Sequence, residues 1–147
     1  MQPLTSFDEL SPGQEFDFGS LTMTEADILD FARRYDPQPF HTDPERAKGT
    51  IFGGLIASGL HTQAAVFGHI IRTGWVEQVS LGGAEQTVRW PAPVRPGDTL
   101  AITARVEELI PSRSKPDRGV VRMRYTARRV QDDVVVLEIL GTHFFRR

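Results

Sequence analysis

A carboxylate and an imidazole lie five positions apart, at Asp36 and His41, in the segment YDPQPFHTDP of residues 35–44. Pro37 and Pro39 each fix φ and remove an N–H donor, so the segment is predicted to stay out of helix and to form a stiff loop. Histidine titrates near neutral pH, whereas aspartate is anionic there and can orient a water or accept its proton. Such a pair can share proton transfer on a bound water, although the same residue types also serve in turns and caps.

A second segment suited to carbonyl chemistry is GGLIASGLH, which begins at Gly53 and leads into an apolar stretch over residues 62–73. Ser58 is predicted to cap a helix through its side-chain oxygen, which places Gly59 in the first turn. Backbone N–H groups there have no partner within the helix, and the helix dipole favours negative charge. This helix start could stabilise a thioester oxygen that becomes an enolate. The two segments together predict addition of water to an α,β-unsaturated thioester, or its removal.

Three motifs in this order resemble the MaoC-like dehydratases, a hotdog-fold family that includes (R)-specific enoyl-CoA hydratases and NodN-like proteins. Asp36 and His41 match the Asp and His of the family signature, roughly Asp-x-Asn-Pro-[Ile/Leu]-His. Ala57-Ser58-Gly59-Leu60 matches the turn into the family's central helix. WPAPVRPGDTL, residues 90–100, is similar to the family's Phe-x-x-Pro-Val-x-x-Gly-Asp-Thr-Leu run. The resemblance extends from about residue 16 to residue 145.

The resemblance implies one hotdog domain over residues 1–147, an α+β fold in which a long curved antiparallel sheet wraps around a central helix. It implies Asp36 and His41 as catalytic residues, and Gln38, Ser58 and Gly59 as residues that bind substrate. Gln38 stands where the family has Asn, and its side chain is one methylene longer. The substrate is expected to be an acyl-CoA thioester, with coenzyme A as part of the substrate, no separate cofactor and no metal. A homodimer or dimer-based oligomer, with sheets joined edge to edge, is also implied.

The expected activity is that of a hydro-lyase in fatty acid metabolism. It would carry out (R)-specific hydration of a trans-2-enoyl-CoA, or the reverse dehydration of a 3-hydroxyacyl-CoA. The motifs would equally suit a substrate on acyl carrier protein or a branched dicarboxylic acyl-CoA. A hotdog thioesterase, which also needs a carboxylate and an oxyanion-holding helix start, is a third possibility. A non-catalytic thioester-binding protein is a fourth.

Composition agrees with one compact domain outside the membrane. The chain has 147 residues, 39% of them hydrophobic, with 17 basic against 19 acidic side chains and no cysteine. A net charge of −2 gives no electrostatic basis for binding nucleic acid or an anionic membrane. The N-terminal residues lack the basic and apolar regions of a signal peptide, and no apolar run approaches a membrane span. We therefore expect a soluble cytoplasmic protein.

Helices are expected at three places. Thr24 can cap a first helix, a short turn of helix follows over residues 44–48, and a long helix runs from about Ser58 to Thr73 and ends at Gly74. Apolar residues at helical spacing form one face of the long helix, and Val66 and Ile70 extend the apolar surface, so the helix is predicted to be wrapped rather than laid on a surface. The residues of this face are Leu60, Ala64, Phe67, Gly68 and Ile71.

Strands are expected on both sides of these helices. Residues 16–22 alternate weakly and predict a first strand. Stronger alternation with a period of two predicts strands over residues 100–106 and 121–128. Asp132 and Asp133 predict a tight turn, and apolar residues on both faces predict an interior strand over residues 134–145.

Four basic residues are candidates for contacting the phosphates of coenzyme A. Arg113, Lys115 and Arg118 lie in an irregular, proline-containing segment, and Arg95 lies in the PVRPG turn. Guanidinium and ammonium groups bind phosphate through charged hydrogen bonds. A charged loop of this kind is also commonly just solvated.

Overall fold

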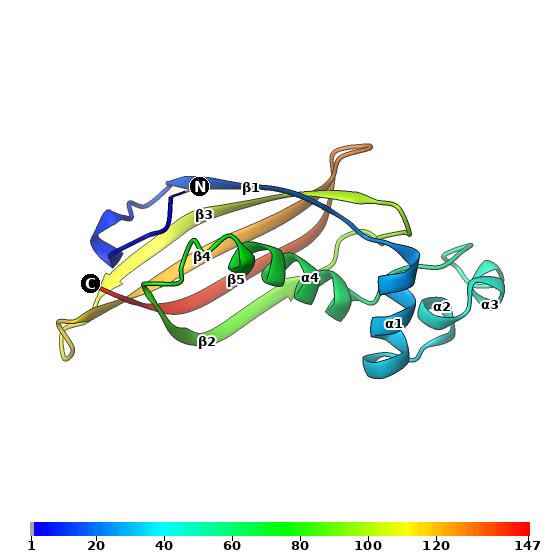
Figure 1. Cartoon of the computed structure of the whole chain (residues 1–147), viewed down its shortest axis with the longest axis horizontal. Coiled ribbons are helices and arrows are strands. Elements are labelled where there is room, and N and C mark those ends of the chain that lie inside the picture. Colours follow the sequence, from blue (N-terminus) through cyan, green and yellow to red (C-terminus); the bar gives the residue numbers. More distant parts are fainter. Residues whose placement is uncertain (1) are drawn as a thin grey trace.

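The computed structural model describes residues 2–147. Helices and strands follow one another in an α+β order (Figure 1). Their bounds are η1 (Phe7–Glu9), β1 (Glu15–Thr22), α1 (Glu25–Tyr35), α2 (Pro39–Thr42), α3 (Pro44–Lys48), α4 (Gly59–Arg72), β2 (Ser80–Arg89), β3 (Thr99–Pro111), β4 (Arg118–Arg129) and β5 (Val134–Arg146).

The strands form one antiparallel sheet in the order β1-β3-β4-β5-β2. The sheet curves around α4, and the helices α1, α2 and α3 lie beyond one of its ends (Figure 1). This arrangement confirms the predicted hotdog fold. Strand β5 lies between β4 and β2, so the prediction of an interior strand at the C-terminus is also confirmed.

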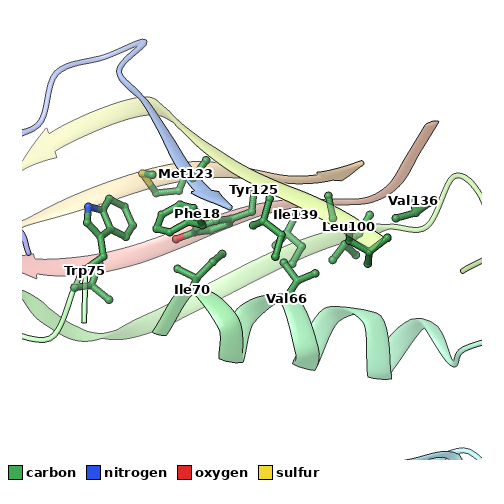
Figure 2. Close-up of a cluster of buried hydrophobic side chains, with 14 of the residues drawn as sticks. Phe18, Val66, Ile70, Trp75, Leu100, Met123, Tyr125, Val136 and Ile139 are labelled. Carbon is green, nitrogen blue, oxygen red and sulfur yellow. The ribbon is translucent and has the colours of Figure 1, made fainter. Parts of the chain in front are cut away.

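The core lies between α4 and the concave face of the sheet. Val66 and Ile70 point from the helix towards Leu100, Tyr125 and Ile139 on the strands (Figure 2). Alternation along β4 and along β3 as far as Val106 produces this face, because every second side chain is buried and those between them are exposed or half-buried. Each fully buried aliphatic or aromatic side chain contributes about 1.5–3 kcal/mol to stability.

The N-terminal segment covers the end of the sheet opposite the helices. The ring of Phe7 packs directly on Gly119 of β4, where an added Cβ would lie 2.5 Å from the ring. The amide of Leu4 donates to the carbonyl of Trp75 at 2.8 Å, just beyond α4. Both chain ends therefore lie far from α1 and α2 (Figure 1).

Helix α4 packs on the sheet through only part of its apolar surface. Thr62, Val66 and Ile70 are buried there, whereas Leu60 and Ile71 are 50% and 44% exposed. The helix carries apolar residues around most of its circumference, and periodicity does not show which side meets the sheet. In the single chain, α4 is covered on one side only.

Strand β2 was not predicted from the sequence. Its residues, SLGGAEQTVR, include two glycines and few β-branched or aromatic residues, which lowers strand propensity. Gly82 has a φ of 123°, and the register with β5 shifts beside Gly82 and again between Gly83 and Glu85. Pairing with β5 therefore forms this strand at the sheet edge where local sequence does not favour it.

The irregular segment between β3 and β4 is shorter than expected, because Pro111 and Arg118 belong to the strands. It lies at the end of the sheet opposite α1 and α2 (Figure 1). Arg118 is engaged by Asp117, with Nε and Oδ1 2.9 Å apart. Within one chain, this cationic segment is thus distant from the helices that carry the predicted catalytic pair.

No helix within residues 2–147 is both long enough and apolar enough to cross a membrane.

Candidate active site

Asp36 is placed by the end of helix α1. Thr24 caps the start of this helix as predicted, since its hydroxyl accepts from the amide of Asp27 at 3.1 Å. The helix ends at Tyr35, and Asp36 is its C-cap residue with an amide that donates to Ala32 at 2.9 Å. Pro37 follows and disfavours further helix. The carboxylate of Asp36 is therefore fixed at the point where the chain turns.

His41 lies in a helix, and the prediction that both prolines keep residues 35–44 out of helix was wrong in this part. Pro39 occupies the first turn of α2. Backbone N–H groups in the first turn make no hydrogen bond within the helix, so proline's lack of an N–H has no cost there, and its fixed φ suits the helix. The turn from Asp36 to Gln38, closed by an amide-to-carbonyl hydrogen bond of 2.8 Å, connects α1 to α2. The two side chains thus come together across a turn between two helix ends.

The predicted catalytic pair is close and largely buried. Nε2 of His41 lies 3.4 Å from Oδ2 of Asp36, and their side chains are 7% and 19% exposed. Nδ1 of His41 lies 2.8 Å from the carbonyl oxygen of Ile56. A carbonyl only accepts, so Nδ1 carries the proton and Nε2 is the atom left to exchange protons.

Two further side chains hold the carboxylate of Asp36. The hydroxyl of Ser58 donates to Oδ2 at 2.6 Å, and the amide of Gln38 donates to Oδ1 at 2.8 Å. Burial raises the pKa of Asp36, but the hydrogen bonds from Ser58 and Gln38 and the nearby charge of His41 outweigh it, so the pKa lies below its usual value. Asp36 is therefore an anionic acceptor at neutral pH.

Ser58 caps helix α4 as predicted. Its side-chain oxygen accepts from the amide of Leu60 at 3.2 Å while its hydroxyl proton goes to Asp36. The cap takes up the amide of Leu60, so the amide of Gly59 at the helix start is not used by it. The same serine thus links the helix start to the carboxylate.

A cavity of about 410 Å³ opens beside this site. Its lining is mostly aromatic, proline and aliphatic, and comprises Phe40, His41, Phe52, Ile56, Ala57, Gly59, Thr62, Trp90, Pro91, Ala92, Pro93, Val94 and Val136. His41 and Gly59 therefore face the cavity. Asp36, Gln38 and Ser58 lie behind them, and the structure places Gln38 and Ser58 against the carboxylate.

Trp90 is a site residue that the sequence reasoning did not identify. It follows β2 and lines the cavity beside the helix start. The WPAPV motif marks this position in the sequence, but a motif at the end of a strand does not show which helix its aromatic residue will contact.

Helix α4 carries two further histidines, His61 and His69. Nε2 of His69 lies 2.9 Å from the carbonyl oxygen of Phe18. His61 instead stacks on Phe31 with ring centroids 4.8 Å apart, and its Nδ1 has no hydrogen-bond partner among residues 2–147. No cluster of three or more His, Asp or Glu side chains suited to a metal is found in the described part of the chain.

The sheet, the central helix and the Asp/His pair at its start define a hotdog protein of the dehydratase type. The chain belongs to the MaoC-like dehydratase family, since the family described as "MaoC like domain" matches residues 8–129. The protein YdeM of Bacillus subtilis is 36% identical over 109 residues, which cover 74% of this chain and 77% of that protein. The (R)-specific enoyl-CoA hydratase of Rhodospirillum rubrum is 31% identical over 111 residues, 73% of each chain.

The crystal structure of a MaoC-like dehydratase from Rhodospirillum rubrum superposes with a TM-score of 0.89 and 35% identity. The match covers 97% of each chain.

Proposed function

We propose that this protein hydrates a trans-2-enoyl-CoA to the (R)-3-hydroxyacyl-CoA, or catalyses the reverse dehydration. The observation that carries the proposal is the convergence of His41 and Gly59 on one cavity, with Asp36 3.4 Å from His41. The cavity wall would then offer His41 as a proton acceptor and the Gly59 amide for a thioester oxygen. The named activity of the Rhodospirillum relative supports the same chemistry.

The proposed step adds one water across the double bond. Asp36, held anionic, orients the water, and Nε2 of His41 takes its proton as the hydroxyl oxygen bonds to C3. The electron pair of the double bond moves onto the thioester oxygen, where the Gly59 amide stabilises the enolate. The enolate then collapses and C2 takes the proton back from His41, so hydrogen and hydroxyl add to the same face.

The cavity lining favours an apolar acyl tail. Phe40, Phe52, Val94 and Val136 would contact the chain beyond C3. A free carboxylate placed among them would lose its hydration without gaining a charged partner, which costs several kcal/mol. We therefore favour a monocarboxylic acyl group over the branched dicarboxylic alternative.

Coenzyme A would enter as part of the substrate, with no other cofactor. Among the predicted phosphate contacts, Arg95 is the one near the cavity, since its Nη2 donates to the carbonyl of the lining residue Phe52 at 2.6 Å. Its guanidinium is positioned by that bond and by the turn in which it lies, so it could meet the phosphates outside the acyl cavity.

The proposed functional unit is a homodimer. Leu60 and Ile71 expose apolar side chains on the uncovered face of α4, and Leu81 is 39% exposed on the edge strand β2. An edge strand with a free hydrogen-bonding side is a template for pairing with a second chain. A two-fold axis at this edge would join the sheets and cover both helices.

The test of the proposed function is a panel of enoyl-CoA substrates followed by loss of the enoyl absorbance. Chiral analysis of the product formed in deuterated water gives the facial selectivity. We expect a single (R) alcohol at C3 and one deuterated epimer at C2. Release of free CoA with an intact double bond would instead establish a thioesterase, and binding without turnover would establish a carrier. An (S) alcohol would contradict the proposed geometry.

A further inference from the structure

Trp90 contacts the helix start that the proposed reaction uses. Its indole Nε1 donates to the carbonyl oxygen of Gly59 at 2.8 Å. Trp90 stands where the similar family motif has Phe, which has no N–H to donate. The flanking Pro91 restricts the backbone on one side, and the end of β2 positions it on the other.

The indole ring also occupies the space above Gly59. A Cβ built on Gly59 would lie 2.8 Å from both Cε2 and Nε1 of Trp90, closer than real Cβ contacts. Position 59 must therefore be glycine while the tryptophan is present. Glycine is the residue with the greatest backbone freedom, and the ring and the hydrogen bond together remove that freedom.

Trp90 is in addition a wall of the cavity that would receive the acyl chain. It lines that cavity together with His41 and Thr62, and it is 46% exposed, which places it at the border with solvent. A smaller side chain there would enlarge the cavity on the side of the helix start.

We propose that Trp90 is a positioning residue for the Gly59 amide and a determinant of acyl-chain selectivity. The indole N–H fixes the carbonyl and the φ and ψ angles of Gly59, and these angles direct the amide towards the thioester oxygen. The ring limits the size of the acyl group beside the helix start. The first role rests on the proposed hydratase function, whereas the second can be measured by binding alone.

Two substitutions separate the roles. Trp90→Phe keeps a ring and removes the donor, so kcat should fall about tenfold while KM changes little, as expected for loss of one hydrogen bond. Trp90→Leu removes the ring as well. It should shift the kcat/KM ratio of trans-2-octenoyl-CoA to trans-2-butenoyl-CoA about tenfold towards the longer chain. The control is Val130→Ala, a 58% exposed residue in the turn after β4, which should leave both values unchanged.

A coupling experiment tests the contact itself. Gly59→Ala should abolish most turnover in the wild-type background because the methyl group meets the indole. In the Trp90→Leu background, the factor by which Gly59→Ala lowers turnover should be at least about tenfold smaller, since the effects of substitutions at contacting residues are non-additive. Equal losses in both backgrounds would overturn the positioning role, whether or not the variants fold less stably.

Binding distinguishes this proposal from the proposed function. If the wild-type protein turns over no enoyl-CoA, the hydratase assignment and the positioning role that rests on it both fail. Calorimetric Kd values for butanoyl-CoA and octanoyl-CoA then decide the selectivity role. A changed Kd ratio in Trp90→Leu supports the role of the ring as a wall, and an unchanged ratio overturns it.

Discussion

At the scale of single residues, Asp36 accepts from two fixed donors and faces a histidine whose tautomer is set by a backbone carbonyl. In the proposed mechanism, Asp36 orients the water and His41 accepts its proton. Their separation of 3.4 Å suits one water held by both side chains. The pair is therefore expected to behave as a unit in mutational tests.

Asp36→Asn and His41→Ala should each lower kcat by roughly 10²–10⁴-fold, because each removes a group that handles the proton of the attacking water. The double variant should be only slightly worse than the poorer single variant, since cooperating groups are non-additive. Steady-state kinetics on an enoyl-CoA measures this, with circular dichroism to verify the fold. Near-normal turnover in either single variant would exclude the mechanism.

Ser58→Ala should affect both activity and stability. It removes the hydrogen bond that lowers the pKa of Asp36, so that pKa should rise and the acidic limb of the pH–rate profile should move to higher pH. It also removes the α4 cap, which costs about 1 kcal/mol.

Thr24→Ala is the matched control for Ser58→Ala. It removes the cap of α1, where Thr24 accepts from Asp27, and makes no bond to Asp36. It should lower the melting temperature similarly and leave the pH–rate profile in place. A shifted profile in Thr24→Ala would show that cap loss alone moves the limb.

At the scale of elements, α4 is buried on one side and apolar on the other. Ile71→Glu on the uncovered side should convert the proposed dimer to a monomer, because it would place a carboxylate in an apolar interface. Ile110→Glu is the control, since Ile110 on β3 is equally exposed at 44% but lies away from α4 and β2. Light scattering coupled to size-exclusion chromatography gives the mass of each variant. A wild-type protein that is monomeric, or an Ile71→Glu variant that stays dimeric, would contradict the proposed interface.

The elements show what local sequence determines. Caps, prolines and alternation located α1, α4, β4, β5 and the start of β3 to within a few residues, because these features act on neighbouring atoms. Strand β2 was not predicted because its formation depends on pairing with β5 rather than on the strand propensity of its own residues. The side of α4 that meets the sheet could not be predicted for a related reason, since only the tertiary fold decides which apolar side is buried.

In the candidate site, too, some features follow from local sequence and others from tertiary contacts. Asp36, His41, Ser58 and Gly59 could be found from residue types and spacing, because each works through its own segment. The contact between Trp90 and Gly59 could not, since it joins residues 31 positions apart in the sequence. The hydrogen bonds of Ser58 and Gln38 to Asp36 likewise required the geometry of the turn.

At the scale of the whole molecule, buried histidines connect stability to pH. Burial lowers the pKa of His143, which hydrogen-bonds Tyr125 across β4 and β5, and burial also lowers the pKa of His61 despite the nearby Asp27. The unfolded chain therefore binds more protons than the folded chain below about pH 6.5. The stabilisation is present above that pH and is lost as the pH falls towards the lowered pKa.

The free energy of unfolding should consequently decrease as the pH falls below about 6.5, and His143→Gln should reduce that decrease. Urea denaturation at several pH values measures both. Tyr125→Phe is the control, because it removes the hydrogen bond and keeps His143 buried, so the pH dependence should persist. An identical pH dependence in His143→Gln and the wild type would exclude His143 as a contributor.

Close contacts between glycines and aromatic rings have a consequence for how this protein can diverge. An added Cβ would meet Phe7 at Gly119, Trp90 at Gly59 and the imidazole of His143 at Gly141, at 2.5–2.8 Å. At each pair the order of substitutions matters: the ring must become smaller before the glycine can gain a side chain, and the reverse order passes through a poorly folded intermediate. Because the effect of each substitution depends on the residue at the other position, the two residues of a pair should change together during evolution. A library that varies Trp90 and Gly59 jointly should therefore reach acyl selectivities that successive single substitutions would not.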